Sequence, residues 1–301
     1  MGEALSLWNG ATSIMKSKTI MVAGSTGFIG SHIIESRPEE FDLSQFITPC
    51  HDSFLDMAVP KADTVIHAAG YAAPSIFMKN PVATIQVNTE TTNFLLGRVN
   101  TGGSFLFCSS SEVYKGLSHP AAESEIGTTT PYHPRAAYIE GKRSGEVIVN
   151  AYRDAGVRAI TARIGLTYGP GTRKYDARVM NQFIEQALTT GKIKLADDGA
   201  GSVTYCYAPD LAAMLWNVLL RGVHGVYNVG GVHAMTVAEL AIHIGKLTGA
   251  EVLTSNGSVG ISQTRMDLTR YNKEFGEFPY TSFEDGLAAT ITYQKALYGI
   301  V

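Results

Sequence analysis

The sequence predicts an α/β protein in which a doubly wound parallel sheet is followed by a smaller C-terminal α/β lobe. Short apolar runs alternate with helical stretches through the first half of the chain, which is typical of parallel strands covered by helices on both faces. The first of these runs leads into a glycine-rich turn and then a helix. After Gly169 the pattern changes to helices mixed with short strands and Gly-rich turns, which indicates a second lobe packed on the first.

The spacing of apolar residues predicts the individual elements in order. The runs 19–23, 63–70, 104–108 and 158–163 have the length and composition of buried strands, and 45–50 is strand-like. Helices are expected over 84–96 and 137–154 in the first part of the chain, and over 179–189, 209–220 and 236–247 in the second.

The composition excludes several classes of function. Lys and Arg number 24 and Asp and Glu 27, so the formal net charge is −3, without the basic excess of proteins that bind nucleic acids or anionic membrane surfaces. No apolar run approaches the roughly 18 residues that a membrane-spanning helix needs. The three cysteines form no CxxC pair, so neither a disulfide framework nor a metal site is expected. Reduced thiols, and an N-terminus without a basic signal-peptide segment, favour a cytoplasmic location.

A glycine turn at residues 24–30 is the first candidate binding feature. Glycines let the backbone turn tightly and approach a pyrophosphate, and the N-terminus of the following helix offers N–H groups to it. A later apolar run ends in small residues that form a flat floor for a nucleotide. The residues expected to bind a dinucleotide are Gly24, Thr26, Gly27, Phe28, Ile29 and Gly30 in the turn, and Ala68, Ala69 and Gly70 in the floor.

These features predict a Rossmann-type domain. We expect it over residues 16–168, with later segments returning to it, after an N-terminal extension over 1–15. Residues 169–301 are then mainly a substrate-binding lobe. Asp52 follows the only strand-like segment between Gly30 and Val65, in the place of the acid that grips the adenosine ribose, with Asp56 as the runner-up. An acid there favours NAD, while His51 beside it keeps NADP as an alternative. Solvated loop carboxylates remain the other interpretation.

Tyr138 and Lys142 stand four residues apart on a predicted helix and so share one face. A neighbouring cation lowers the pKa of a phenol, so this pair predicts a tyrosine that acts as a base. The serines at 109–111, at the end of a predicted strand, can place a hydroxyl beside the phenol. A pair of surface residues would show the same spacing by chance, so the pair gains weight only from the glycine turn, the small-residue floor and the serine run that precede it.

Taken together, these motifs resemble the extended short-chain dehydrogenase/reductase superfamily. Within it the chain is most similar to NAD-dependent nucleotide-sugar epimerases, dehydratases and decarboxylases, and its motifs most resemble those of UDP-glucuronate decarboxylases. The similarity runs from Thr19 to about Tyr298. Its motifs include Ala73-Pro74, Asn80-Pro81-Val82 with Asn88, Ser109-Ser110-Ser111-Glu112-Val113-Tyr114, Tyr138-x-Glu140-Gly141-Lys142-Arg143, Tyr168-Gly169-Pro170 and Asp210-Leu211.

The resemblance implies a role for each matching residue. Ser110 would bond the sugar O4, Tyr138 would remove its proton, and Lys142 would hold the nicotinamide ribose and lower the pKa of Tyr138. Ser111 and Glu112 stand where family dehydratases have an Asp–Glu pair for acid–base elimination, and family decarboxylases also have Ser-Glu there. The resemblance further implies cofactor contact by Asn88 and substrate contact by Ala73.

The chain departs from the family pattern at three points. The segment between Gly30 and Asp52 is about 20 residues shorter than usual, as if one strand–helix unit were lost or fused. Leu166 replaces an Asn that usually contacts the substrate diphosphate, and Val203 stands where an Arg is usual. An arginine pairs with phosphate as a fork, so its loss is not neutral. Arg173, Arg178 and Arg265 are therefore expected to hold the diphosphate. The alternative is that these three arginines are surface charges and that the substrate is not a usual nucleotide diphosphate sugar.

The leading hypothesis is an NAD-dependent enzyme that oxidises C4 of a nucleotide sugar transiently, without net redox change. An NAD(P)H-dependent ketoreductase acting on a less anionic substrate is the second hypothesis, motivated by Leu166 and Val203. A non-catalytic nucleotide-binding protein is the third, and the intact Tyr138 and Lys142 pair speaks against it. A homodimer formed through helices 84–96 and 137–154 is expected by analogy with the family.

Overall fold

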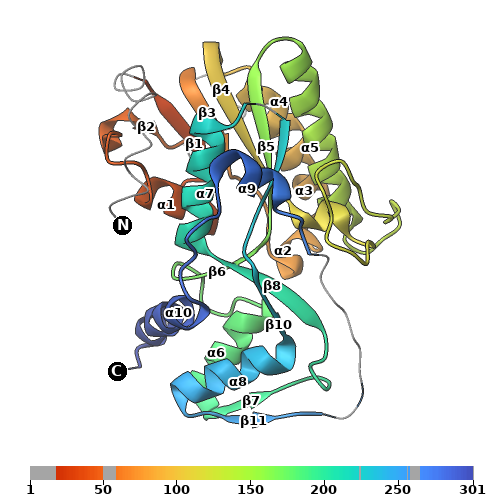
Figure 1. The fold of residues 1–301 in the computed structure, drawn as a ribbon, viewed down its shortest axis with the longest axis vertical. Helices are drawn as coiled ribbons and strands as arrows, with labels where there is room; N and C mark the ends of the chain where they lie inside the picture. Colours follow the sequence, from red (N-terminus) through yellow and green to blue (C-terminus); the bar gives the residue numbers. More distant parts are fainter. Residues whose placement is uncertain (1–17, 50–58, 224, 256, 258–264, 301) are drawn as a thin grey trace.

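The computed structural model describes residues 18–49, 59–223, 225–255, 257 and 265–300, arranged as two lobes (Figure 1). The larger lobe is built on a six-stranded sheet whose neighbouring strands all run parallel. In spatial order its strands are β2 (Phe46–Ile47), β1 (Ile20–Ala23), β3 (Ala62–His67), β4 (Val99–Ser110), β5 (Arg158–Ile164) and β9 (Gly225–Val229). The predicted parallel α/β sheet is therefore confirmed.

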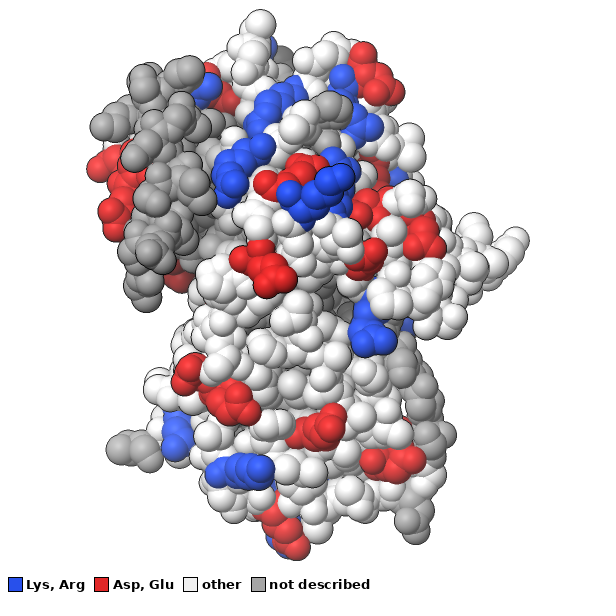
Figure 2. Space-filling view, viewed as in Figure 1, with Lys and Arg blue, Asp and Glu red and all other residues white. Residues whose placement is uncertain are grey.

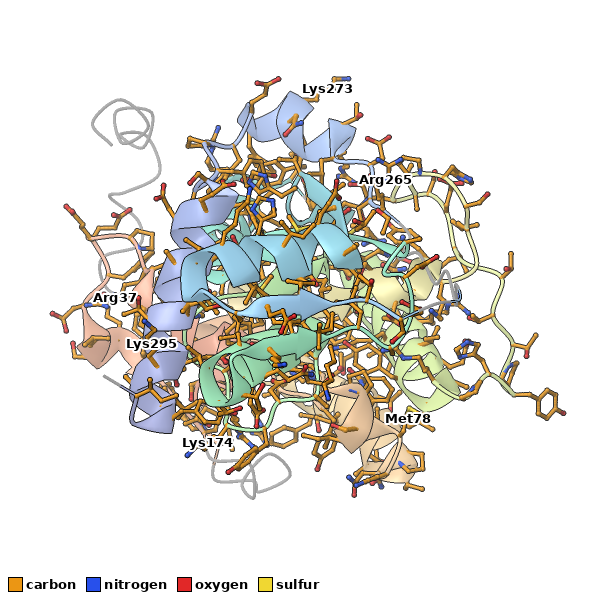
Figure 3. The ribbon with its side chains drawn as sticks, turned by 90° about the horizontal axis from the view of Figure 1, so that it is seen from below. Arg37, Met78, Lys174, Arg265, Lys273 and Lys295 are labelled. Carbon is orange, nitrogen blue, oxygen red and sulfur yellow. The ribbon has the colours of Figure 1, made fainter. Side chains whose placement is uncertain are left out.

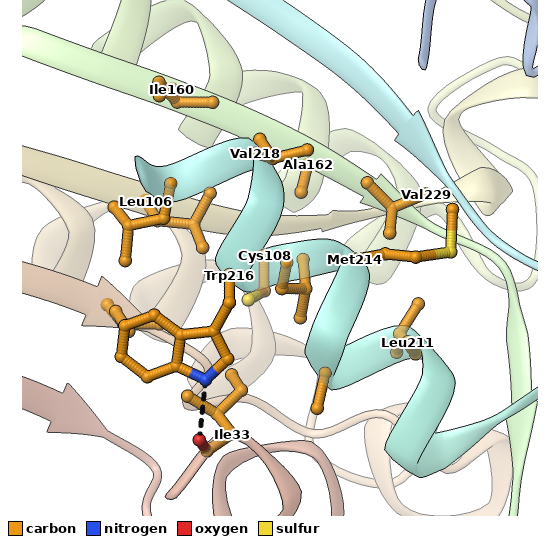
Figure 4. Packing of buried hydrophobic residues seen from close by; sticks show 14 of the residues in the cluster. Ile33, Leu106, Cys108, Ile160, Ala162, Leu211, Met214, Trp216, Val218 and Val229 are labelled. Carbon is orange, nitrogen blue, oxygen red and sulfur yellow. Dashed lines mark hydrogen bonds between the residues drawn. The ribbon is translucent and has the colours of Figure 1, made fainter. Parts of the chain in front are cut away.

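Helices cover both faces of this sheet. On one face, α1 (Phe28–Glu35), α7 (Ala208–Arg221) and α9 (Thr269–Phe275) contribute to a core with β1, β3, β4, β5 and β9. Figure 4 shows a hydrogen bond that joins α7 to α1: the buried Trp216 indole donates from Nε1 to the Ile33 carbonyl at 2.9 Å. On the other face, α4 (Glu90–Leu96) and α5 (Ala136–Asp154) pack with α3 (Pro81–Asn88) on a second core.

The smaller lobe has its own core. Its main sheet has the order β10 (His233–Thr236), β8 (Ser202–Tyr207) and β6 (Leu166–Tyr168), and β7 (Lys192–Lys194) pairs with β11 (Glu251–Leu253). The helices α6 (Val179–Thr190), α8 (Val237–Thr248) and α10 (Phe283–Tyr298) pack around these strands (Figure 1). The chain passes between the lobes repeatedly, because α7, β9 and α9 belong to the larger lobe although β6 and α6 precede them in the sequence.

The structure refines several predicted elements. The helix expected over 84–96 is two helices, α3 and α4, which meet at Thr89. Short helical turns that the sequence did not predict occur at η2 (Leu43–Gln45), α2 (Pro74–Phe77) and η4 (Ser111–Tyr114). Among the described residues, β2 is the one strand beyond β1 on its side of the sheet, which agrees with the short segment after Gly30. The expected N-terminal extension, like His51, Asp52 and Asp56, lies outside the described residues.

The charges on the surface are mixed in sign. In Figure 2, acidic and basic side chains are interspersed over both lobes, as the small net charge of the sequence suggests. Within the described part of the chain, no helix is long and apolar enough to cross a membrane. The same residues contain no group of three or more His, Cys, Asp or Glu side chains that could hold a metal ion.

Candidate active site

The glycine turn lies directly against the end of β3. Gly24 has a φ of +86°, and a Cβ atom added to it would lie 2.6 Å from the Ala69 backbone nitrogen. The Gly27 N–H donates to the Gly24 carbonyl at 2.9 Å, which closes the turn. Helix α1 then begins without a side-chain cap, so its first N–H groups are available to an anion. A turn packed this tightly on β3 and followed by available helix N–H groups fits the pyrophosphate of a dinucleotide.

The floor predicted at the end of β3 connects the glycine turn to Lys142. Ala69 is buried between the turn and the sheet core, and a Cβ added to Gly70 would lie 4.0 Å from Lys142 Nζ. Of the other turn residues, Phe28 and Ile29 are half-buried and Thr26 is exposed. The Phe28 ring lies 5.2 Å from the Arg178 guanidinium, which brings the turn next to the smaller lobe.

Ser110, Tyr138 and Lys142 come together at the carboxyl end of β4. Ser110 ends the strand, and its Oγ accepts the Glu112 N–H at 3.2 Å to begin η4. The Ser110 side chain lies close enough to the Tyr138 phenol to lower its pKa. Lys142 lies one turn further along α5 and donates from Nζ to the Cys108 carbonyl at 2.7 Å. All three predicted side chains are buried.

The pKa of Tyr138 lies above its ordinary value in this arrangement. Burial raises the pKa of Tyr138 to about 12, and the polar interaction with Ser110 only partly offsets it. The ammonium of Lys142 is committed to the Cys108 carbonyl and lies 5.9 Å from the centre of the Tyr138 ring. Burial also lowers the pKa of Lys142 to about 8. Desolvation is the largest cause of both pKa shifts because both side chains have left water.

Glu112 is held by a residue that the sequence analysis did not select. Arg135 donates from its NH1 group to Glu112 Oε1 at 2.9 Å. Its guanidinium also lies 5.3 Å from the centre of the Phe77 ring, and that ring stacks on Tyr138. The sequence feature that could have pointed to Arg135 is its position: it precedes Tyr138 by three residues and therefore lies one helical turn before it.

A cavity of about 220 Å³ lies between α2, β6, β8 and the start of α6. Both departures from the family pattern, Leu166 and Val203, line it. Arg178 is the one charged side chain among its described lining residues. The Arg178 guanidinium already pairs with Asp176: Arg178 Nε donates to Asp176 Oδ1 at 2.9 Å, and Arg178 NH2 donates to Asp176 Oδ2 at 2.6 Å. The full lining is Pro74, Leu166, Thr167, Tyr168, Ala177, Arg178, Val179, Met180, Asn181, Val203, Tyr205 and Val237.

A second, much smaller cavity of about 10 Å³ brings Ser111 and Arg265 together. Leu166 and Thr204 also line it, so it adjoins the lining of the larger cavity. The Thr204 Oγ1 atom is buried and has no hydrogen-bond partner within the described structure. The lining thus combines two hydroxyl-bearing residues with the exposed Arg265 around a space that holds about one water molecule.

The remaining predicted residues lie outside these groups. Asn88 is buried at the end of α3, where it donates to the Thr84 carbonyl of the same helix at 2.7 Å and lies against Gly141 and Gly145 of α5. Ala73 caps α2 next to Pro74, which lines the larger cavity. Arg173 is exposed and lines neither cavity. Figure 3 shows Arg265 on the opposite side of the smaller lobe from Lys174, the neighbour of Arg173 in the sequence.

The glycine turn, the parallel sheet and the buried Ser110, Tyr138 and Lys142 define a protein of the dinucleotide-binding α/β class. A family model of the NAD dependent epimerase/dehydratase family matches residues 45–230. The chain belongs to this family.

Characterised relatives extend the match over most of the chain. UDP-glucuronic acid decarboxylase 5 of Arabidopsis thaliana is 30% identical over 295 residues, covering 89% of this chain and 86% of that protein. UDP-glucuronic acid decarboxylase 1 of Xenopus tropicalis is 30% identical over 302 residues, covering 92% and 72%. Among solved structures, UDP-glucose 4-epimerase of Thermotoga maritima aligns with a TM-score of 0.78 at 23% identity, covering 93% of this chain and 99% of that one. The dTDP-glucose 4,6-dehydratase DesIV of Streptomyces venezuelae aligns with a TM-score of 0.78 at 22% identity, covering 93% and 98%.

Proposed function

We propose that the protein is an NAD-dependent enzyme that modifies a nucleotide sugar through transient oxidation at C4, without net redox change. The observation that carries the proposal is the buried set of Ser110, Tyr138 and Lys142, with Glu112 at the same strand end. Family membership and the names of the decarboxylase relatives support the same reaction class.

The chain's own residues divide the chemistry among them. The Gly24–Gly30 turn and the Ala68–Gly70 floor bind the cofactor. Lys142, whose ammonium lies beside Gly70, keeps the cofactor in place. NAD bound there would supply the hydride acceptor for C4 and the hydride donor for the final reduction, and the positive charge of its oxidised ring would favour ionisation of a nearby phenol. Tyr138 takes the proton from the sugar O4, and Ser110 orients that oxygen.

Glu112 serves the step that follows the oxidation. Its Oε1 accepts from Arg135, whereas its Oε2 is buried without a partner within the described structure. A free carboxylate oxygen next to the Ser110 and Tyr138 pair is available to handle a proton at a sugar carbon that the 4-keto group has activated. A neighbouring ketone stabilises the carbanion or enolate left by loss of a proton or of CO2, so one site can support epimerisation, dehydration or decarboxylation.

Of the three possible reactions, decarboxylation is the one that the lining of the small cavity favours. Ser111, Thr204 and Arg265 line this cavity, and the unpartnered Thr204 Oγ1 leaves a donor for one polar group of a substrate there. The relatives named above are decarboxylases of UDP-glucuronic acid, a sugar that bears such a group. We therefore propose a nucleotide-linked uronic acid as the substrate, with its carboxylate directed to Arg265 and its nucleotide in the larger cavity near Arg178.

The test is to incubate the purified protein and NAD with UDP-, dTDP-, GDP- and CDP-sugars, including UDP-glucuronic acid, and to identify products by NMR. Conversion of the uronic acid with release of CO2 is expected. Absence of turnover with every sugar would overturn the proposal. Net consumption of NADPH with a simple carbonyl substrate would instead support the ketoreductase, which the apolar lining of the larger cavity favours.

We also propose a homodimer formed through α3 and α5. These helices pack against each other, and they expose apolar side chains to solvent: Val82 and Ile85 on α3, and Val147 on α5. Val82 is 68% exposed and Val147 67%, which is costly for a surface without a partner. Cys108 and Cys206 are free, buried thiols, which supports the further proposal of a cytoplasmic location.

A further inference from the structure

We propose that Arg135 is a positioning residue of the active site, which fixes Glu112 with one oxygen directed to the substrate and balances its charge beside Tyr138. This inference rests on the proposed function, because it assigns a role within that reaction. The sequence patterns did not single out Arg135, and its role follows from three contacts at the start of α5.

The first contact is the ion pair with Glu112. The NH1 group of Arg135 donates to Glu112 Oε1 at 2.9 Å, and the two side chains are only 26% and 16% exposed. Glu112 Oε2 is buried and lacks a partner within the described structure. A buried carboxylate oxygen without a donor is costly, and such groups persist where a ligand or reacting group completes them. Arg135 therefore anchors one oxygen while the other stays available.

The second contact runs through an aromatic ring. The Arg135 guanidinium lies 5.3 Å from the centre of the Phe77 ring, which is close enough for a cation–π interaction. Phe77 in turn stacks on Tyr138 with the ring centres 4.7 Å apart and the planes only 12° from parallel. The guanidinium, Phe77 and the phenol thus form a continuous series of contacts, which ties Arg135 to the base as well as to Glu112.

The third contact fixes the backbone of Arg135. Arg135 is the N-cap residue of α5, and its N–H donates to His133 Nδ1 at 3.1 Å. The Tyr138 N–H donates to the Arg135 carbonyl within the first turn of the helix. The backbone at Arg135 is therefore fixed from both sides, so its side chain leaves the helix start at a defined position.

Electrostatics gives Arg135 a second effect, on the base. The groups that face Tyr138 are Ser110 and Cys108 on β4, Glu112 on η4, Phe77 on α2, and Lys142 and Arg135 at α5, while His133 contacts the Arg135 backbone. The negative charge of Glu112 raises the pKa of Tyr138, whereas the positive charge of Arg135 lowers it. The ion pair thus keeps a necessary carboxylate close to a phenol that must ionise.

The experiment compares Arg135→Met, Arg135→Lys and Glu112→Gln with the unmodified protein and NAD, using the nucleotide sugar that is turned over. Lys192→Met is the matched control, because it breaks the exposed Lys192–Glu251 ion pair of the smaller lobe. Arg135→Met should lower kcat by about 10- to 100-fold and leave KM within about threefold. Arg135→Lys should recover part of the loss, and Lys192→Met should match the unmodified protein.

The pH profile separates positioning from a general structural role. Loss of the Arg135 cation should move the ascending limb of the profile to higher pH, and Glu112→Gln should move it to lower pH. Opposite shifts are not expected from two variants that merely loosen the fold. An unchanged kcat and pH profile in Arg135→Met would overturn the inference alone. If the unmodified protein turns over no nucleotide sugar, the proposed function fails and the inference fails with it.

Discussion

Replacing Gly24 by alanine should weaken NAD binding strongly, and the structure sets the size of the effect. Gly24 has a φ of +86°, which costs an alanine about 1–2 kcal/mol. The new Cβ would also lie 2.6 Å from Ala69 N and 2.7 Å from the Ala68 carbonyl carbon, and neither backbone atom can rotate away. Relieving that overlap costs about 1–3 kcal/mol more. The sum is about 2–5 kcal/mol, concentrated where the turn approaches the pyrophosphate.

Isothermal titration calorimetry with NAD measures this directly. If the turn moves away from β3, Kd should rise at least about 30-fold, since each 1.4 kcal/mol is a factor of ten. Gly102→Ala is the matched control, because Gly102 has a φ of +75° but no atom within 4 Å of its added Cβ. That variant should lose about 1–2 kcal/mol of stability and bind NAD normally. A folded Gly24→Ala protein that binds NAD within threefold of the unmodified protein would refute the reasoning.

Three further predictions concern Tyr138, Arg163 and Lys142. Tyr138→Phe keeps the stack on Phe77 but removes the hydroxyl, so turnover should fall at least about 100-fold. Calorimetry should show unchanged NAD affinity, and normal turnover would contradict the role of Tyr138 as the base. Arg163→Met leaves the buried Glu146 without its bidentate partner, so urea denaturation should show a loss of about 3–5 kcal/mol, and a loss below about 1 kcal/mol would speak against it. The pKa of Lys142 is about 8 in the fold against 10.5 as the ordinary value, so the unfolded chain binds more protons between these pH values. The free energy of unfolding, relative to Lys142→Met, should therefore rise by on the order of 3 kcal/mol from pH 8 to 10.5, and a flat difference would count against the buried ammonium.

Features that depend on neighbouring residues in the sequence could be predicted. The glycine turn and the small residues at 68–70 were each recognised from a local pattern, and the structure brings them together because both follow parallel strands, whose carboxyl ends share one edge. Helix α5 was predicted to within one residue at its start, since a long amphipathic segment has a strong 3.6-residue period. The break at Thr89 was missed, because the apolar residues on either side of it still suit one helix.

Features that depend on distant segments could not be predicted. Spacing alone placed an ammonium beside the Tyr138 phenol, but the distance between them depends on the Cys108 carbonyl, which lies on another element. The ion pair of Glu112 with Arg135 joins residues 23 positions apart across a long loop, and no local period records it. Desolvation, which dominates both pKa shifts, exists only once the lobe has packed around these groups.

The return of β9 and α9 to the larger lobe has a consequence for synthesis on the ribosome. The core on one face of the main sheet combines Ile20 and Val22 with Val229 and Tyr271, so it needs chain from both ends of the protein. The residues of β6, α6, β7 and β8 are made in between. A nascent chain that stops at residue 168 has β5 as an uncovered edge and lacks the α7 side chains that fill this core. The cofactor-binding lobe therefore completes its fold only after most of the smaller lobe has emerged, and a cut at the apparent boundary yields no independent half.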